Sequence, residues 1–186
     1  MTAATISAFR LRRRDLLATI LAPVIASRVV SGQSAVRTRV LATAHFRVAV
    51  PEKDWRLLSA GLNTFGSIVH KDGAAAIVIE HELLQIALAP EEINATFLEF
   101  EVSTVKERET TASGVTGRVD PAGRRRAIID FQRRGNDGAE QVRVVVVVQG
   151  KHLYRLVCVA PAAQFARYAP TFQAVCDSFA SIDAPA

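Results

Sequence analysis

The stretch VVVVVQGKHLYRL, residues 144–156, decides the fold class. Its five consecutive valines, Val144 to Val148, leave no polar side for water, and such a run is typical of a strand that is covered on both faces. Gly150-Lys151 then interrupts the apolar pattern, and a glycine at the first central position of a two-residue loop suits a type II′ turn. The stretch therefore predicts a hairpin inside a sheet that lies between helical layers.

Other strand-like runs lie on both sides of this hairpin in the sequence. Each is apolar or alternating and is bounded by turn residues, which indicates a strand. The expected strands cover residues 45–51, 67–70, 74–82, 115–119, 124–133, 141–149 and 152–160. The turn residues Lys71-Asp72-Gly73 and Gly135-Asn136-Asp137-Gly138 favour antiparallel hairpins between neighbouring strands.

Two segments have the spacing of helices. Pro90-Glu91-Glu92 places a proline and two acids in a first helical turn, which predicts a helix as far as about Thr104. A second helical region lies near the C-terminus, because six residues fall on one helical face: Phe165, Tyr168, Phe172, Val175, Cys176 and Phe179. Pro170 is expected to break this region and to begin its second piece.

These elements resemble the Mog1/PsbP-like α/β/α sandwich. Phe46–Pro51 ahead of Asp54-Trp55 is similar to that group's opening strand and tryptophan loop, and residues 149–156 followed by the helical face from Phe165 to Phe179 are similar to its closing hairpin and helix. The resemblance implies an α+β fold, with an antiparallel twisted sheet and helices on both faces. Members act largely as binding or assembly proteins, including photosystem II extrinsic subunits, a nuclear-transport GTPase partner and bacterial envelope proteins, which implies a non-enzymatic role.

The N-terminus has the features of an export leader. Arg13-Arg14-Asp15-Leu16-Leu17 matches the twin-arginine pattern, and the apolar run that follows ends at Ala26 after about eleven residues, whereas a membrane-spanning helix needs about twenty. The expected organisation is a signal peptide over residues 1–26, a linker over 27–44, the domain over 45–182 and a tail over 183–186. No transmembrane span is expected once the leader is cleaved.

This leader predicts export to the periplasm or the extracellular space. A thylakoid-lumen destination stays open, because an arginine-rich and acid-poor start also suits a transit peptide. An uncleaved amphipathic arm and a cleavage site after Ala35 are further alternatives. The formal charge of +5 also reflects the leader, because four arginines oppose only Asp15 within residues 1–26. The nearly balanced remainder argues against a nucleic-acid partner.

The sequence contains no recognisable catalytic, cofactor-binding or metal-binding motif. His81-Glu82-Leu83-Leu84-Gln85 lacks the second histidine of the zinc-protease motif and is expected at the end of a strand. Glu80 and Glu82 share one side of that strand, where paired carboxylates more commonly face water than hold a cation. The histidines at positions 45, 70, 81 and 152 have no ligand-like spacing. We therefore expect no enzymatic activity, no cofactor and no resident metal.

Two groups of residues suggest interactions. Arg124, Arg126 and Arg134 are expected to share one strand face around Asp130 and to form a patch for an acidic partner or a lipid headgroup. Cys158 and Cys176 are expected on the last strand and the closing helix, so a disulfide between them is one option, while two buried free thiols are the other.

The sequence thus predicts an exported, non-enzymatic binding or assembly module with a protein partner. The alternatives are a carrier that holds a small apolar ligand between sheet and helix, and an enzyme of unrecognised type. The oligomeric state does not follow from the sequence.

Overall fold

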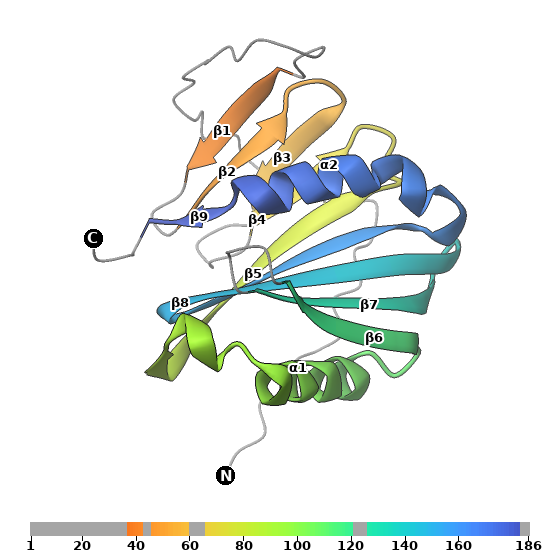
Figure 1. The fold of residues 1–186 in the computed structure, drawn as a ribbon. Coiled ribbons are helices and arrows are strands. Elements are labelled where there is room, and N and C mark those ends of the chain that lie inside the picture. Colours follow the sequence, from red (N-terminus) through yellow and green to blue (C-terminus); the bar gives the residue numbers. More distant parts are fainter. Residues whose placement is uncertain (1–36, 43–45, 60–65, 121–125, 183–186) are drawn as a thin grey trace.

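The computed structural model describes residues 37–42, 46–59, 66–120 and 126–182 (Figure 1). The strands are β1 (Thr38–Ala42), β2 (Phe46–Pro51), β3 (Trp55–Ser59), β4 (Gly66–His70), β5 (Ala76–Leu88), β6 (Ser113–Asp120), β7 (Arg126–Gly135), β8 (Gly138–Pro161) and β9 (Ala180–Ser181). The α-helices are α1 (Ala95–Arg108) and α2 (Phe165–Ser178), and the 3-10 helices are η1 (Pro90–Glu92) and η2 (Ala162–Gln164).

The larger sheet has the strand order β3-β4-β5-β8-β7-β6. All of its neighbouring strands are antiparallel. β8 is long because it folds back at Gly150: residues 138–146 pair with β7, and residues 150–159 pair with β5. Gly150 has a φ of 59°, which glycine adopts without the steric cost that a side chain brings. Figure 1 shows the two halves of β8 side by side, so the hairpin expected at this glycine is present.

A smaller sheet with the order β1-β2-β9 packs beside α2 (Figure 1). β1 lies within the segment that was expected to be a linker, so ordered structure begins at least by Thr38. β9 pairs with β2 through Phe46 opposite Ser181 and Arg47 opposite Ala180. The chain that follows α2 is thereby tied to the first strands of the domain.

The two faces of the larger sheet are covered by different helices (Figure 1). On one face, α2 and the smaller sheet enclose a core that includes Val48, Ile77, Leu156 and Phe172. On the other face, α1 packs over a second core that includes Ile129, Val144 and Val146. Within the valine run, Val144 and Val146 therefore serve one core while Val145 serves the other. This arrangement confirms the predicted α/β/α sandwich.

α1 begins later than the sequence predicted. Pro90–Glu92 forms only a single 3-10 turn, and α1 begins after Asn94, whose side-chain oxygen accepts a hydrogen bond of 3.1 Å from the Phe97 backbone amide. An asparagine at this position satisfies a free amide of the first helical turn, which fixes where the helix starts. Glu92 instead caps the 3-10 turn by accepting a hydrogen bond from the Ala89 amide.

The expectation that Pro170 divides the C-terminal helix is wrong. α2 runs through Pro170 without interruption. Proline removes the hydrogen bond to the carbonyl of residue 166, but both Pro170 and Ala166 are exposed, so water can satisfy that carbonyl. Trp55 also differs from its expected loop position, because it begins β3 and packs against His70, Tyr168 and Phe172.

Within the described part of the chain, neither α-helix combines the length and the apolar character that crossing a membrane requires.

Candidate functional site

The outer end of β5 presents apolar side chains to solvent. β4 pairs with β5 only as far as Ile79, so among the described strands only β8 pairs with residues 80–88. The pairing with β8 is also irregular between Leu83 and Leu88. Leu83 is 67% exposed and Ile86 is 69% exposed. A strand edge that its described neighbour leaves unpaired, and that carries exposed apolar side chains, is a template for a partner chain.

A buried charge cluster lies under the same strand, on the α1 face of the sheet. Arg155 of β8 donates two hydrogen bonds of 2.8 Å to the carboxylate of Glu101 on α1 and one of 2.7 Å to Glu82 on β5. Glu101 is only 1% exposed. The bidentate pair fixes α1 against the sheet, and its geometry satisfies both ions where water cannot reach them.

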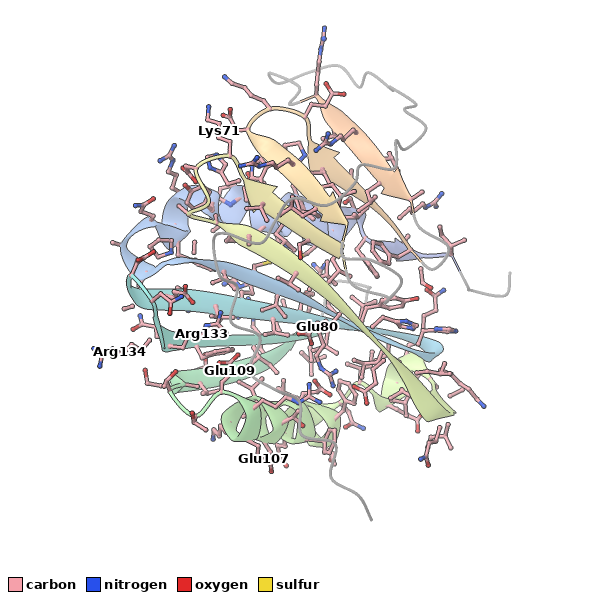
Figure 2. The ribbon with its side chains drawn as sticks, turned by 180° about the vertical axis from the view of Figure 1, so that it is seen from behind. Lys71, Glu80, Glu107, Glu109, Arg133 and Arg134 are labelled. Carbon is pink, nitrogen blue, oxygen red and sulfur yellow. The ribbon has the colours of Figure 1, made fainter. Side chains whose placement is uncertain are left out.

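Glu80 completes the acidic side of this cluster. The register places Glu80 opposite Arg155, so both side chains lie on the α1 face, and Figure 2 shows Glu80 over the middle of the sheet. Burial raises the pKa of Glu80 above its ordinary value, and the positive charge of Arg155 only partly opposes this. Burial also disfavours the charge of Arg155, but the hydrogen bonds that Arg155 donates to Glu101 and Glu82 outweigh this effect and raise the pKa of Arg155. Glu80 and Glu82 share one side of β5 as predicted, but Glu80 is half-buried there and does not face water as expected.

Two of the four histidines meet on the opposite face of β5. His81 lies directly opposite Tyr154, and Leu83 lies opposite His152, which makes the two histidines diagonal neighbours on β5 and β8. His81 Nε2 and His152 Nδ1 are 2.9 Å apart, within hydrogen-bond distance. Both side chains are half-buried. His70 lies elsewhere, with its Nδ1 2.7 Å from a carboxylate oxygen of Asp72, and His45 is outside the described residues.

The arginines of the predicted patch are placed differently from one another. Arg126 is only 7% exposed, and its guanidinium binds Asp120 at 2.8 Å and Asp177 at 2.6 Å, which ties β7 to the end of α2. Arg134 is exposed, and Figure 2 shows it projecting from the edge of the sheet. Arg124 is outside the described residues, as are the export residues Arg13, Arg14, Leu16 and Leu17. The patch therefore stays a prediction that rests here on Arg134 alone.

The two cysteines lie together between the sheet and α2. Their sulfur atoms are 3.8 Å apart, and both side chains are buried as free thiols. The neighbouring Cys176 and burial raise the pKa of Cys158 well above its ordinary value. Cys158 is therefore a poor thiolate while it is buried, and a disulfide at this position stays a prediction.

Two shallow hollows of about 370 and 340 Å³ lie along β6, β7 and the start of β8. They share Ser113 and Gln132 on the outer strands and are lined largely by polar residues. The space between the sheet and α2 is instead filled by side chains such as Phe172 and Leu156, which have no exposed surface. The described residues thus give no support to a carrier of an apolar ligand.

Sequence reasoning missed both the histidine pair and the buried ion pair. His81 and His152 are separated by 71 positions, and Glu101 and Arg155 by 54. No local motif signals such distances, because the strand order and the register of β5 on β8 create both contacts. The sequence also did not reveal that Leu83 and Ile86 are exposed, because both continue a strand whose first half is more buried.

No protein-family model matches the sequence, and no curated protein is similar to it in sequence. Comparison with solved structures finds the solution structure of cyanobacterial PsbP (CyanoP) from Synechocystis sp. PCC 6803, with a TM-score of 0.51 and 9% identity over 83% of this chain and 98% of that one. LpqN, involved in cell envelope biogenesis of Mycobacterium tuberculosis, is 16% identical over 73% of this chain and 82% of its own, with a TM-score of 0.49. The match to CyanoP confirms the PsbP-like fold and carries no function with it.

Proposed function

We propose that this chain is an exported, non-enzymatic binding or assembly module, and that it contacts a protein partner through the outer end of β5. The observation that carries the proposal is the exposure of Leu83 and Ile86 on a strand edge that β4 leaves unpaired. Burying two such side chains stabilises a complex by about 1.5 to 3 kcal/mol each. An incoming strand on the side of β5 that β4 leaves uncovered beyond Ile79 would add backbone hydrogen bonds.

A site-specific crosslink tests this contact directly. A photoreactive phenylalanine analogue at position 83 in the native cells should yield one reproducible protein adduct. The matched control is position 107, because Glu107 is also exposed but lies on the outer side of α1 (Figure 2). Leu83→Ser with Ile86→Ser should abolish copurification of the same adduct partner while leaving thermal stability unchanged. An adduct that forms equally at positions 83 and 107, or none at position 83, overturns the proposal.

The export half of the proposal rests on the leader residues and has its own test. Replacing Arg13 and Arg14 by lysine preserves the charge but removes the twin-arginine pattern, so the precursor should accumulate inside the cell. Intact mass spectrometry of the wild-type product should show a chain that begins after Ala26 or Ala35. Recovery of a product that still carries Met1 from the cytosolic fraction contradicts export.

A further inference from the structure

We propose that His81 and His152 form a binding site for a divalent transition-metal ion of the zinc, copper and nickel class. Neutral imidazole nitrogen is a preferred ligand of all three ions. Two nitrogen atoms bound to one such ion at about 2.0 to 2.1 Å, with an angle of about 90° to 109° between the bonds, lie about 2.9 to 3.4 Å apart. His81 Nε2 and His152 Nδ1 are 2.9 Å apart, which is within this range.

The sheet holds the two rings in place before an ion arrives. The histidines stand on adjacent strands whose register is regular from Ala76 to Leu83. Tyr154 packs against the His81 ring with 4.7 Å between the ring centroids, and the Tyr154 hydroxyl is 3.1 Å from the Ser181 hydroxyl. Side chains that are fixed by packing lose less conformational entropy when they bind an ion, so the pair is preorganised.

Half-burial of both rings leaves room for an ion to enter from solvent. Among the described residues, no cluster of three or more histidine, cysteine, aspartate or glutamate side chains is arranged for a metal. The described residues therefore supply two protein ligands to the proposed site, and further ligands such as water would complete the coordination. Open positions of this kind are typical of sites that exchange ligands rather than of closed structural sites.

Metal binding requires a rearrangement of one proton. In the neutral pair, one ring donates its N–H to the other, so one of the two facing nitrogens carries a hydrogen. That hydrogen must move to the other nitrogen of the same ring, which produces the alternative neutral tautomer and releases no proton overall. The ring planes differ by only 13°, so both rings must also turn slightly to direct their lone pairs at a common point.

The site is tested with the tag-free chain, titrated by calorimetry with Zn²⁺ alone and then with Ni²⁺ alone in a buffer that does not bind metals. We expect one ion per chain, and His81→Ala and His152→Ala should each weaken binding at least about tenfold, because each removes one of the two protein nitrogens. The matched control is His70→Gln, which replaces a histidine outside the pair and should leave the affinity unchanged.

A second measurement covers the case in which a variant fails to fold. The electron paramagnetic resonance spectrum of Cu²⁺ bound to the unaltered chain should show coupling to two imidazole nitrogens. The proposal is overturned if no ion binds, if binding survives in both folded histidine variants, or if the copper spectrum shows fewer than two imidazole nitrogens.

Discussion

The two helices cover opposite faces of one sheet, yet different kinds of interaction hold them against it. α2 buries five side chains, four of them apolar or aromatic core residues and one a cysteine: Phe165, Tyr168, Phe172, Val175 and Cys176. α1 buries only Glu101, which is ion-paired to Arg155, and its apolar residues remain partly exposed. The α2 layer therefore depends on fully buried apolar area, whereas the α1 layer combines partly exposed apolar contacts with one buried charge pair.

Because of this difference, the two layers should respond differently to single substitutions. Apolar packing is distributed over many contacts, so losing one side chain leaves a cavity but keeps the layer in place. A buried ion pair is concentrated in two residues, and removing either partner leaves a charge without compensation. We infer that the α1 layer is the part of the molecule whose attachment is most sensitive to a single polar substitution.

The largest expected effect lies in the α2 layer. Phe172→Ala should lower the free energy of unfolding by about 4 kcal/mol, because Phe172 has no exposed surface and contacts the rings of Trp55 and Phe165. Urea denaturation measures the change. A loss below about 1 kcal/mol would mean that α2 contributes little to the core.

The matching substitution in the α1 layer is Glu101→Ala, with an expected loss of about 3 kcal/mol, because among the described residues only Glu82 then accepts a hydrogen bond from Arg155. Glu107→Ala removes the same charge from the exposed side of α1 and should change stability by less than about 0.5 kcal/mol. Equal losses in the two variants would break the comparison between buried and exposed acids on one helix.

A disulfide would sharpen the contrast by joining α2 to the sheet covalently. If the protein is exported and meets a disulfide-forming oxidant, Cys158 and Cys176 should resist alkylation under denaturing conditions until a reductant is added. Reduction should then lower the free energy of unfolding by about 2 kcal/mol. Full alkylation without reductant rules the bond out and leaves two buried thiols.

Gly117 tests how closely α1 approaches β6. A Cβ atom at this position would lie 2.9 Å from a Leu98 methyl group and 3.0 Å from a Val102 methyl group. Gly117→Ala should cost about 1 kcal/mol, because the Leu98 and Val102 side chains of α1 must move away from the added methyl group, whereas Thr116→Ala on the neighbouring exposed position should be nearly neutral. Denaturation midpoints of the two variants give the comparison, and equal midpoints contradict the close approach.

The smallest effect concerns Glu80. Burial raises the pKa of Glu80 in the folded protein above the ordinary value of 4.5. As the pH rises, the unfolded chain therefore releases this proton at a lower pH than the folded protein does. The free energy of unfolding then falls between the pKa of the unfolded chain and the higher pKa of the folded protein. Glu80→Gln should therefore increase stability slightly at pH 7 and have no such effect at pH 4. Glu82→Gln should decrease it at pH 7, since Glu82 accepts a hydrogen bond from Arg155. A decrease for Glu80→Gln would show that its charge is stabilised.

The parts that could be predicted from sequence are those with a local pattern. The valine run and the helical face from Phe165 to Cys176 show by their apolar pattern which residues are buried, and the glycines mark the turns between strands. The sandwich and its closing helix could therefore be predicted from them. The capping of α1 by Asn94 was missed, because Pro90 and two acids give an equally good helix start.

The candidate sites could not be predicted in the same way. His81 with His152, and Glu101 with Arg155, are joined only through strand order and register. The patch predicted from Arg124, Arg126 and Arg134 had a local pattern, but one strand face cannot reveal that Arg126 is paired with Asp177 of α2. Long-range pairing therefore creates the candidate sites, while short-range patterns indicate the fold.

The most direct test of the contrast between the two layers is a double-mutant cycle on Glu101 and Arg155. The free energies of unfolding of the unaltered chain, Glu101→Ala, Arg155→Ala and the double variant give the coupling between the two side chains. The account predicts a coupling of roughly 2 kcal/mol or more, because the pair is bidentate and buried. A coupling below about 0.5 kcal/mol would contradict it and would place the attachment of α1 in its apolar contacts instead.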